Sequence, residues 1–291
     1  MFSVIMPYFE RPELLRVSLL AMHMVYRSKQ FEVVVVDDFS HPTLRPMIPD
    51  GLSFSVTVVT LESKNGINPC VPYNIGAGVA KGDYLVLTSP EVVPTRDILF
   101  EADAILEREA FPTARPPYIL FEVFGLTDKV INREMISATS ENQNRLALDR
   151  ALSEIKAKEP DFLRKGKDPQ KPWSNEFGAW YQHSTLKPSD LNFLSVIPRS
   201  LYQQLGGFCE RFRRGTGYDD LNFLDRVKPK STLHRVLGLA ATHLCHEEIS
   251  ARKEFNTTIN TNRNLYYFLK ILRLGPLRSK HLYKTKIYPA V

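Results

Sequence analysis

The stretch FEVVVVDDFS, residues 31–40, decides the fold class. Its run of valines has no polar alternation, which is typical of a strand buried on both faces of a parallel sheet. The run ends in two acidic residues, Asp37 and Asp38. In open parallel sheets, ligands bind outside the carboxyl ends of the strands, so these carboxylates mark the place where a binding site is expected. A role in a turn or a helix cap is the alternative for both.

Strand and helix patterns alternate along the chain on either side of this stretch. The predicted strands are FSVIM (residues 2–6) and residues 55–60, 83–88 and 117–123, and the predicted helices are residues 11–28, 70–81 and 95–110. This alternation predicts βαβ units, and therefore an α/β fold with a mostly parallel central sheet that is covered by helices. Farther along, residues 141–158 have helical spacing, residues 160–172 are polar and predict a loop, and residues 177–250 again contain strands.

The charge of the chain is concentrated at one end. Among 291 residues, 38 are basic and 32 acidic, which gives a formal net charge of +6. Residues 263–291 hold seven basic residues and no acidic one, so the rest of the chain is close to neutral. A basic body that binds phosphates along its surface is therefore disfavoured, and we expect no nucleic acid as a partner.

The basic tail has a pattern of its own. Leu265, Phe268, Leu269 and Leu272, with Lys270 between them, fit an amphipathic helix. Two interpretations are open: a helix docked on the rest of the chain, or a peripheral anchor on an anionic membrane.

Cysteine usage and the N-terminus indicate the compartment. Cys70, Cys209 and Cys245 form neither a disulfide framework nor a C-x-x-C zinc pattern. The N-terminal run lacks the features of a signal peptide, and no stretch reaches the length of a membrane-spanning helix. We therefore expect a cytoplasmic protein.

Glycine motifs for phosphate binding are missing from the sequence. After Met6 the chain continues as PYFERP, without the G-x-G-x-x-G of a Rossmann fold, and there is no P-loop. A bound nucleotide would therefore need side chains and a divalent metal at its phosphates. Glu91, in LTSPEVVP just past a predicted strand, is a candidate ligand of Mg²⁺ or Mn²⁺, and a solvated turn glutamate is the alternative.

Two histidines in THLCHEE are further candidate ligands. His243 and His246 could share a metal if the segment is helical. The apolar run before them is strand-like, and in an extended segment residues three apart point to opposite faces, so only one could then reach the site.

The segment GGFCERFRRGTGYDDLNFLDR, residues 206–226, is the densest group of glycine, aromatic and charged residues. Asp219 and Asp220 follow Gly215 and Gly217 and open a helical pattern. The two carboxylates could simply stabilise the helix N-terminus, or one could be a general base presented from a glycine-flanked loop. The flanking glycines and aromatic residues favour the base.

A second aromatic group lies in WSNEFGAWYQH, residues 173–183. Its aromatic rings beside polar groups could form a stacking platform for a sugar. Packing in the core is an equally good interpretation for any single ring.

Five segments together resemble, in the same order, the GT-A glycosyltransferases, in particular the large inverting family numbered two, with an acidic motif similar to that of galactosyltransferases. The segments are SVIMPYFERPELL (3–15), VVVVDDFS (33–40), the stretch from Asn65 through NIGAGVAKGDYLVL (74–87) to SPEVVP (89–94), GGFCERFRRGTGYDD (206–220) and THLCHE (242–247). The resemblance implies a GT-A fold with a nucleotide-sugar half over residues 1–125, a helix and loop over 126–176, an acceptor-binding and catalytic half over 177–250, and a basic tail over 251–291.

The resemblance also implies roles for individual residues. The donor-binding residues would be Pro7, Tyr8, Glu10, Arg11, Asp37, Asp38, Asn65, Gly66, Asn74 and Ser89. The metal, Mn²⁺ or Mg²⁺, would be held by Glu91, His243 and His246. The acceptor would contact Trp180, Tyr181, His183, Gly207 and Tyr218. Asp220, next to Asp219, would take the proton of an acceptor hydroxyl, so that one direct displacement inverts the anomeric configuration.

The sequence departs from the family's pattern in two places. Ser89-Pro90-Glu91 stands where the family has its D-x-D metal motif, and Pro72-Tyr73-Asn74 stands where Ala-Arg-Asn is frequent. A metal-independent transferase and a GT-A-like binding protein without catalysis are therefore alternatives. The expected partners are a nucleotide-sugar donor, with UDP-sugars favoured, a glycan, lipid-linked or protein acceptor, and a membrane surface contacted by residues 263–291.

Overall fold

The computed structural model describes residues 1–27, 30–42, 44, 48–64, 66–108, 115–127, 145–188, 190–245, 254–272 and 285–288. Its strands are β1 (Phe2–Tyr8), β2 (Phe31–Asp37), β3 (Ser55–Leu61), β4 (Tyr84–Leu87), β5 (Val92–Pro94), β6 (Pro117–Leu126), β7 (Ser174–Asn175), β8 (Gly178–Gln182), β9 (Ser195–Pro198), β10 (Thr232–His243) and β11 (Thr285–Tyr288). The helices are α1 (Pro12–Val25), α2 (Cys70–Val79), α3 (Ile98–Arg108), α5 (Arg145–Ala157), α6 (Glu159–Phe162), α7 (Arg199–Gln204), α8 (Asp219–Val227) and α9 (Glu254–Ile271), with 3₁₀ turns η2 (Glu210–Arg214) and η3 (Lys228–Lys230).

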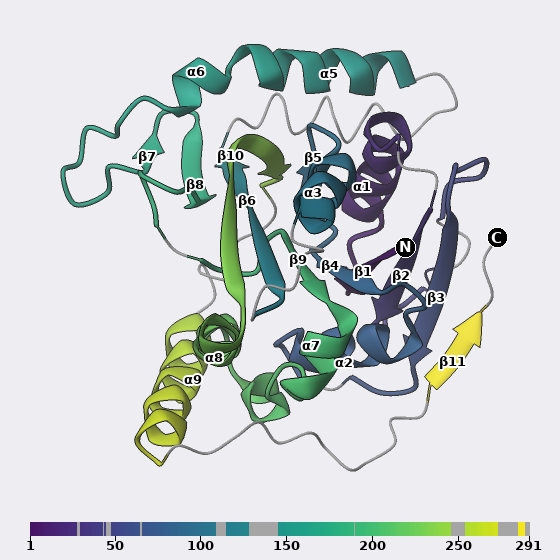
Figure 1. The fold of residues 1–291 in the computed structure, drawn as a ribbon, viewed down its shortest axis with the longest axis vertical. Helices are drawn as coiled ribbons and strands as arrows, with labels where there is room; N and C mark the ends of the chain where they lie inside the picture. The colour runs from purple at the N-terminus through teal and green to yellow at the C-terminus, as the bar shows by residue number, and fades with distance from the viewer. Residues whose placement is uncertain are drawn as a thin grey trace.

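All strands belong to one mixed sheet with helices on both faces (Figure 1). The order is β11-β3-β2-β1-β4-β9-β6-β10-β5, and β8, which pairs with β7, lies beside β6. The strands β3, β2, β1 and β4 are parallel to one another, while β9 runs antiparallel to both of its neighbours and joins the two halves of the sheet. The predicted α/β fold, with a central sheet covered by helices, is confirmed.

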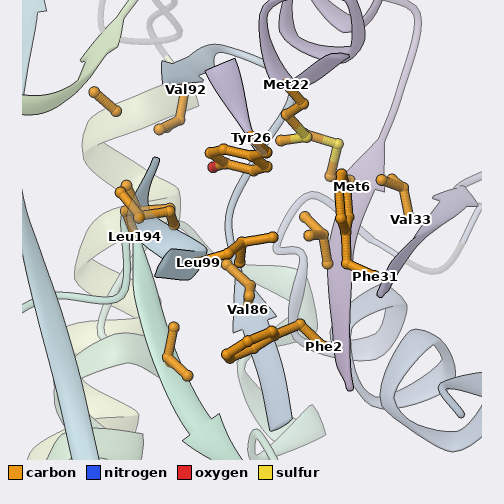
Figure 2. Packing of buried hydrophobic residues seen from close by; sticks show 14 of the residues in the cluster. Phe2, Met6, Met22, Tyr26, Phe31, Val33, Val86, Val92, Leu99 and Leu194 are labelled. Atoms are coloured by element: carbon orange, nitrogen blue, oxygen red, sulfur yellow. The ribbon is translucent and has the colours of Figure 1, made fainter. Parts of the chain in front are cut away.

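The valines of β2 show why the parallel part of the sheet is buried on both faces. Because side chains alternate along a strand, Val33 and Val35 pack in one core with α1 and α3, whereas Val34 and Val36 pack in a second core with α2. Figure 2 shows the first core from close by, where strand residues such as Met6 and Val33 meet Met22 of α1 and Leu99 of α3. The unbroken apolar run of β2 therefore packs against helices on both faces of the sheet.

The basic tail is part of the same fold where it is described. Helix α9 packs against α8 and η2 through the buried Tyr266 and Leu269, and the Asn262 side chain donates a hydrogen bond to the Phe212 carbonyl at 3.0 Å. Strand β11 pairs antiparallel with β3 at the edge of the sheet (Figure 1). The docked-helix interpretation is thus confirmed for α9. Among the described residues, no helix combines the length and apolarity needed to cross a bilayer.

One expected loop begins with a helical turn. The polar composition predicts a loop over residues 160–172, but the first of them belong to α6. Phe162 in this turn is buried and stacks on Phe124 with ring centroids 4.3 Å apart. The rest of the range, residues 163–172, has no helix or strand.

Candidate active site

The parallel strands β1, β2, β3 and β4 are neighbours, so their carboxyl ends lie along one edge of the sheet. The predicted donor residues follow these ends in the chain. Pro7 and Tyr8 close β1 and are buried, and Asp37 closes β2. Burial raises the pKa of the Tyr8 phenol to about 12, so this hydroxyl is neutral at physiological pH.

The turn after β2 is tied to the turn after β1. The Asp38 N–H donates to the Tyr8 carbonyl at 2.9 Å, and the Glu10 N–H donates to the Ser40 hydroxyl at 3.0 Å. One oxygen of Asp37, Oδ1, accepts the Ser40 N–H at 3.0 Å, while Oδ2 is buried and has no hydrogen-bond partner in the described part of the protein. Asp37 thus secures the turn and keeps one acceptor unused.

Lys64 completes this corner of the site. Its Nζ lies 3.3 Å from Oδ2 of the buried Asp38 and 2.8 Å from the ring centroid of the partly exposed Phe9. Burial lowers the pKa of Lys64, although Asp38 works in the opposite direction. An accessible aromatic ring beside a carboxylate can stack on a flat ring and accept its N–H groups, which suits a nucleobase.

Arg11 and Glu91 form an ion pair at the centre of the site. Arg11 immediately precedes α1, and Glu91 lies in the turn between β4 and β5; the guanidinium contacts Oε1 of Glu91. His243 ends β10 opposite Val92, and the N–H of Leu244 donates to the Glu91 carbonyl at 2.8 Å. The predicted residues Arg11, Glu91 and His243 are thus brought together.

Glu91 keeps its negative charge although it is buried. Burial pushes its pKa upward, but the positive charge of Arg11, the imidazole of His243 and a hydrogen bond from Ser89 together lower the pKa below its ordinary value. The carboxylate therefore has its positive partner within the protein.

These residues do not fit a divalent metal site. The guanidinium of Arg11 contacts the Glu91 carboxylate and compensates the charge that a metal would need. His243 is the other predicted ligand near Glu91, and His246 lies outside the described residues. Within the described ranges, no group of three or more His, Cys, Asp and Glu side chains is arranged to hold a metal ion. The expectation that Glu91 and His243 bind Mn²⁺ or Mg²⁺ is therefore not supported by their surroundings.

Asp219 and Asp220 begin α8, after Tyr218 in a left-handed backbone conformation with φ of 64°. Asp219 is buried and accepts a hydrogen bond from the Asn68 amide at 2.7 Å. Asp220 is half-buried and accepts one from the Asn192 amide at 3.1 Å. The two asparagines come from other parts of the chain and hold both carboxylates in place.

The acidic pair retains a proton at neutral pH. Burial and the neighbouring charge of Asp219 raise the pKa of Asp220 to about 8. Burial also raises the pKa of Asp219, although the Asn68 hydrogen bond opposes the shift. A deprotonated carboxylate with such a pKa is a stronger base than an ordinary aspartate, as a general base requires.

Aromatic side chains connect the acidic pair with the Arg11–Glu91 pair. The Tyr73 hydroxyl donates to the Thr88 carbonyl at 2.8 Å, and the charges of Asp220, Asp219 and Glu91 all act on this phenol. Burial is the main reason why the pKa of Tyr73 is raised, so it stays neutral. Tyr73 stands where the family frequently has arginine, and it adds no positive charge here.

A second aromatic connection runs through Tyr181. Its ring stacks on Phe193 with centroids 4.8 Å apart and meets His243 edge-on at 4.6 Å. Phe193 directly follows Asn192, the hydrogen-bond donor to Asp220. Tyr181 therefore contacts His243 and the residue that follows Asn192, and its acceptor role stays a prediction.

Trp180 and His183, the other two residues predicted in this segment, do not form a platform together with Tyr181. Alternation along β8 puts Trp180 and Tyr181 on opposite faces: Trp180 is fully buried, and its indole N–H donates to the Phe162 carbonyl at 2.9 Å. His183 is also buried; its Nδ1 accepts backbone N–H groups from Thr185 and Leu186, and its Nε2 lies 3.7 Å from Glu122. Both side chains are occupied by structural contacts.

Two further predicted contacts are used inside the protein. The Asn74 amide donates to the Phe208 carbonyl and to Glu210, and its oxygen accepts from Tyr202 and the Phe208 N–H. Gly207 is buried, and its carbonyl accepts a hydrogen bond from Arg226. Both residues therefore form contacts between elements of the protein.

The loop before α2 shows why Gly66 is a glycine. A Cβ atom at this position would lie 2.0 Å from the Arg213 carbonyl oxygen, which accepts the N–H groups of Ile67 and Asn68. This close approach fixes Asn68, and through it Asp219. Asn65 lies outside the described residues, and Tyr218 is half-buried with its ring beside Tyr266.

The sequence predictions missed Lys64, Asn68 and Asn192, and also Phe9, which directly follows β1. Lys64 follows the end of β3 and Asn68 immediately precedes the Pro69–Cys70 start of α2, so position relative to the strands was a usable signal for both. Asn192 carries no such signal, because its role depends on a contact between distant parts of the chain.

Comparisons with known proteins address the fold. No protein-family profile matches the sequence, and no curated protein matches it. Among solved structures, S. aureus TarS 1-349 in complex with UDP-GlcNAc is 16% identical, with a TM-score of 0.56 over 90% of this chain and 65% of that chain. Mannosyltransferase PcManGT from Pyrobaculum calidifontis, in complex with GDP-Man and Mn²⁺, is 17% identical, with a TM-score of 0.54 over 95% and 65%. The likeness covers less than two thirds of either of those chains, and it shows that this chain has the fold of GT-A glycosyltransferases.

Proposed function

We propose that the protein is a glycosyltransferase that moves a sugar from a nucleotide-diphosphate donor to an acceptor hydroxyl with inversion. The observation that carries this proposal is the Asp219–Asp220 pair at the start of α8, whose second carboxylate has a pKa of about 8. The neighbouring folds support the donor class, because TarS structures are described with UDP and UDP-GlcNAc and PcManGT with GDP-Man.

In the proposed reaction, deprotonated Asp220 accepts the proton of the acceptor hydroxyl. The acceptor oxygen forms a bond to the anomeric carbon while the bond from that carbon to the diphosphate oxygen breaks on the opposite side. The bonding electrons leave with the nucleoside diphosphate, and the single displacement inverts the configuration. Asn192, which donates to Asp220 Oδ1 at 3.1 Å, orients the base.

The donor base is proposed to lie at the corner formed by Phe9, Asp38 and Lys64. The ring of Phe9 offers a stacking surface, and the carboxylate of Asp38 can accept the N–H of a pyrimidine or purine. UDP-sugars are the favoured donors, and an assay with one uracil and one guanine donor decides between the two bases.

The test measures nucleoside-diphosphate release from UDP-GlcNAc and from GDP-mannose, in Mn²⁺ and in EDTA. We expect release from one donor by the wild-type chain, and its loss in Asp220→Asn. The matched control is Asp103→Asn, since Asp103 is exposed on α3 and, within the described part of the chain, forms no hydrogen bond or ion pair with the site residues named above. Full turnover by Asp220→Asn would disprove the base assignment, and donor binding without release would favour the binding protein.

The outer face of α9 supports a membrane as the place where the acceptor resides. Tyr267, Phe268, Ile271 and Leu272 are each at least half exposed. The tail that includes them, residues 263–291, has seven basic residues and no acidic one. Apolar side chains within a basic segment are attracted to anionic lipid surfaces. We propose a lipid-linked acceptor on this basis, and glycan and protein acceptors are the alternatives.

Flotation with anionic and with neutral vesicles tests this contact. We expect the wild-type chain to float with phosphatidylglycerol vesicles and to lose this binding in Phe268→Ser/Ile271→Ser. Leu237→Ser is the control, because Leu237 is also more than half exposed but lies on β10. Equal flotation of all three chains, or flotation of none, would contradict the membrane contact.

A further inference from the structure

The positive group nearest to Glu91 is a guanidinium. Strands β1 and β4 are parallel neighbours, so the segments that follow them, with Arg11 and Glu91, meet at the same edge of the sheet although they are far apart in sequence. In the resemblance described above, Glu91 stands at the place of the D-x-D motif, whose metal would face the donor's diphosphate. Arg11 therefore brings a positive charge next to the position at which the resemblance implies the diphosphate.

We propose that Arg11, anchored by Glu91, binds the diphosphate of the nucleotide donor in place of a divalent metal ion. This inference rests on the proposed function, because it assumes a nucleotide-diphosphate donor. It adds the group that takes up the charge of the leaving nucleoside diphosphate.

The different exposure of Arg11 and Glu91 supports the proposal that Glu91 anchors Arg11 and that Arg11 binds the diphosphate. The Glu91 side chain is only 7% exposed, whereas 32% of the Arg11 side chain is exposed. One nitrogen of Arg11, Nη1, contacts Glu91, and a guanidinium has five N–H donors in a fixed planar arrangement. The buried carboxylate can thus hold the guanidinium in one orientation while other N–H groups remain for a second anion.

The chemistry of the leaving group suits such a contact. As the bond between the anomeric carbon and the diphosphate oxygen breaks, negative charge builds up on the diphosphate. Arginine binds phosphate oxygens through paired, charge-assisted hydrogen bonds, and a donor that is already oriented needs no rearrangement during the reaction. The contact of Arg11 with Glu91 therefore favours both binding and departure of the nucleoside diphosphate.

A simpler role for Arg11 has to be separated from this one. Arg11 could only neutralise Glu91, and Arg11→Gln would then weaken nucleotide binding because it leaves a buried negative charge unpaired. The double variant Arg11→Gln/Glu91→Gln removes both charges at once. It should restore binding if Arg11 merely neutralises Glu91, and it should remain weak if Arg11 contacts the diphosphate.

The experiment measures calorimetric binding of UDP and GDP, and of uridine and guanosine, to the full chain in EDTA. For the wild-type chain, we expect one of the diphosphates to bind at least about tenfold more tightly than its nucleoside, as charge-assisted hydrogen bonds predict. In Arg11→Gln and in the double variant this advantage should disappear, and Arg11→Lys should keep part of it. Arg108→Gln is the control, because Arg108 is exposed and bonds to Ala104 in its own helix.

Each possible result has a defined meaning. A wild-type chain that binds UDP or GDP only when Mn²⁺ is present, or that binds it in EDTA no more tightly than the nucleoside, would overturn the inference and leave the proposed function intact. A double variant that binds the diphosphate as tightly as the wild-type chain would also overturn it. If neither diphosphate binds in EDTA or in Mn²⁺, the proposed function fails together with the inference. Circular dichroism of each variant checks that the fold is retained.

Discussion

Glu91 and Asp220 are acidic groups of the same site, and desolvation acts on both in the same direction, yet their pKa values move in opposite directions. Glu91 lies beside Arg11 and His243, and its pKa is lowered. Asp220 lies beside Asp219, and its pKa is raised to about 8. Since burial alone raises the pKa of a carboxyl group, the sign of the neighbouring charge decides the outcome. The surroundings of Glu91 favour the charged carboxylate beside a cation, whereas those of Asp220 favour its protonated form.

The largest expected effect concerns the base itself. General acid–base catalysis contributes roughly 10²- to 10⁴-fold, so Asp220→Asn should lower kcat for nucleoside-diphosphate release by about this factor. The donor's KM should change little, because Asp220 acts on the acceptor. Steady-state release assays over a range of donor concentrations measure both constants, and a large rise in KM with unchanged kcat would assign Asp220 to binding instead.

The pH dependence of the rate tests the raised pKa. Asp220 must lose its proton to act as a base, so kcat/KM should increase about tenfold per pH unit below pH 8 and level off above it. Asp219→Asn removes the neighbouring negative charge, and the rising part of its profile should move to lower pH. A wild-type profile that is flat between pH 6 and pH 8 would contradict the assigned base.

The raised pKa of Asp220 should make the folded chain less stable as the pH rises. The folded chain holds this proton up to about pH 8, whereas an unfolded aspartate releases it at about pH 4. Unfolding therefore releases a proton between these values, and the wild-type chain loses stability as the pH rises through them. The side-chain amide introduced by Asp220→Asn does not titrate, so the Tm of this variant relative to the wild-type chain should increase from pH 4 to pH 8.

The smallest expected effect is the opposite trend at Glu91. Its folded pKa lies below the ordinary value of 4.5, so its contribution to stability is present above about pH 4.5 and is lost as the pH falls through the lower folded pKa. The Tm deficit of Glu91→Gln should therefore be largest near neutral pH and shrink toward pH 3. Thermal scans in the same buffers should show that the Tm of Asp220→Asn rises relative to the wild-type chain with increasing pH, whereas that of Glu91→Gln falls. Trends of the same sign would contradict the opposite pKa shifts of the two carboxyl groups.

The sequence predicts the strands that position this site better than it predicts the contacts among the side chains of the site. The run FEVVVVDDFS identifies a doubly buried strand and the edge at which polar residues gather, because strand periodicity is a local property. Trp180 and Tyr181 show the limit: they are adjacent in a predicted aromatic group, but alternation along β8 sends one into the core. Arg11 and Glu91 were each predicted at the site, yet their pairing depends on strand order, which no local pattern contains.

The hydrogen-bond partners of the acidic pair were the hardest to predict. Asn192 and Asn68 reach Asp220 and Asp219 from distant parts of the chain, and neither stands in a recognisable motif. Asn74 shows the opposite case. It stands at a motif position for which donor binding is predicted, but its side-chain amide bonds to the backbone of Phe208. Long-range contacts therefore decide which asparagine amides bond to the acidic pair.

The pairing of β11 with β3 has a practical consequence for self-association. Thr285–Tyr288 cover the edge of a strand whose backbone N–H and C=O groups would otherwise be open. An uncovered edge strand pairs readily with another chain, so a protein shortened before residue 285 would present a template for aggregation. Point substitutions on α9 are therefore the safer way to study the tail, since clustering of a truncated chain would imitate binding to vesicles.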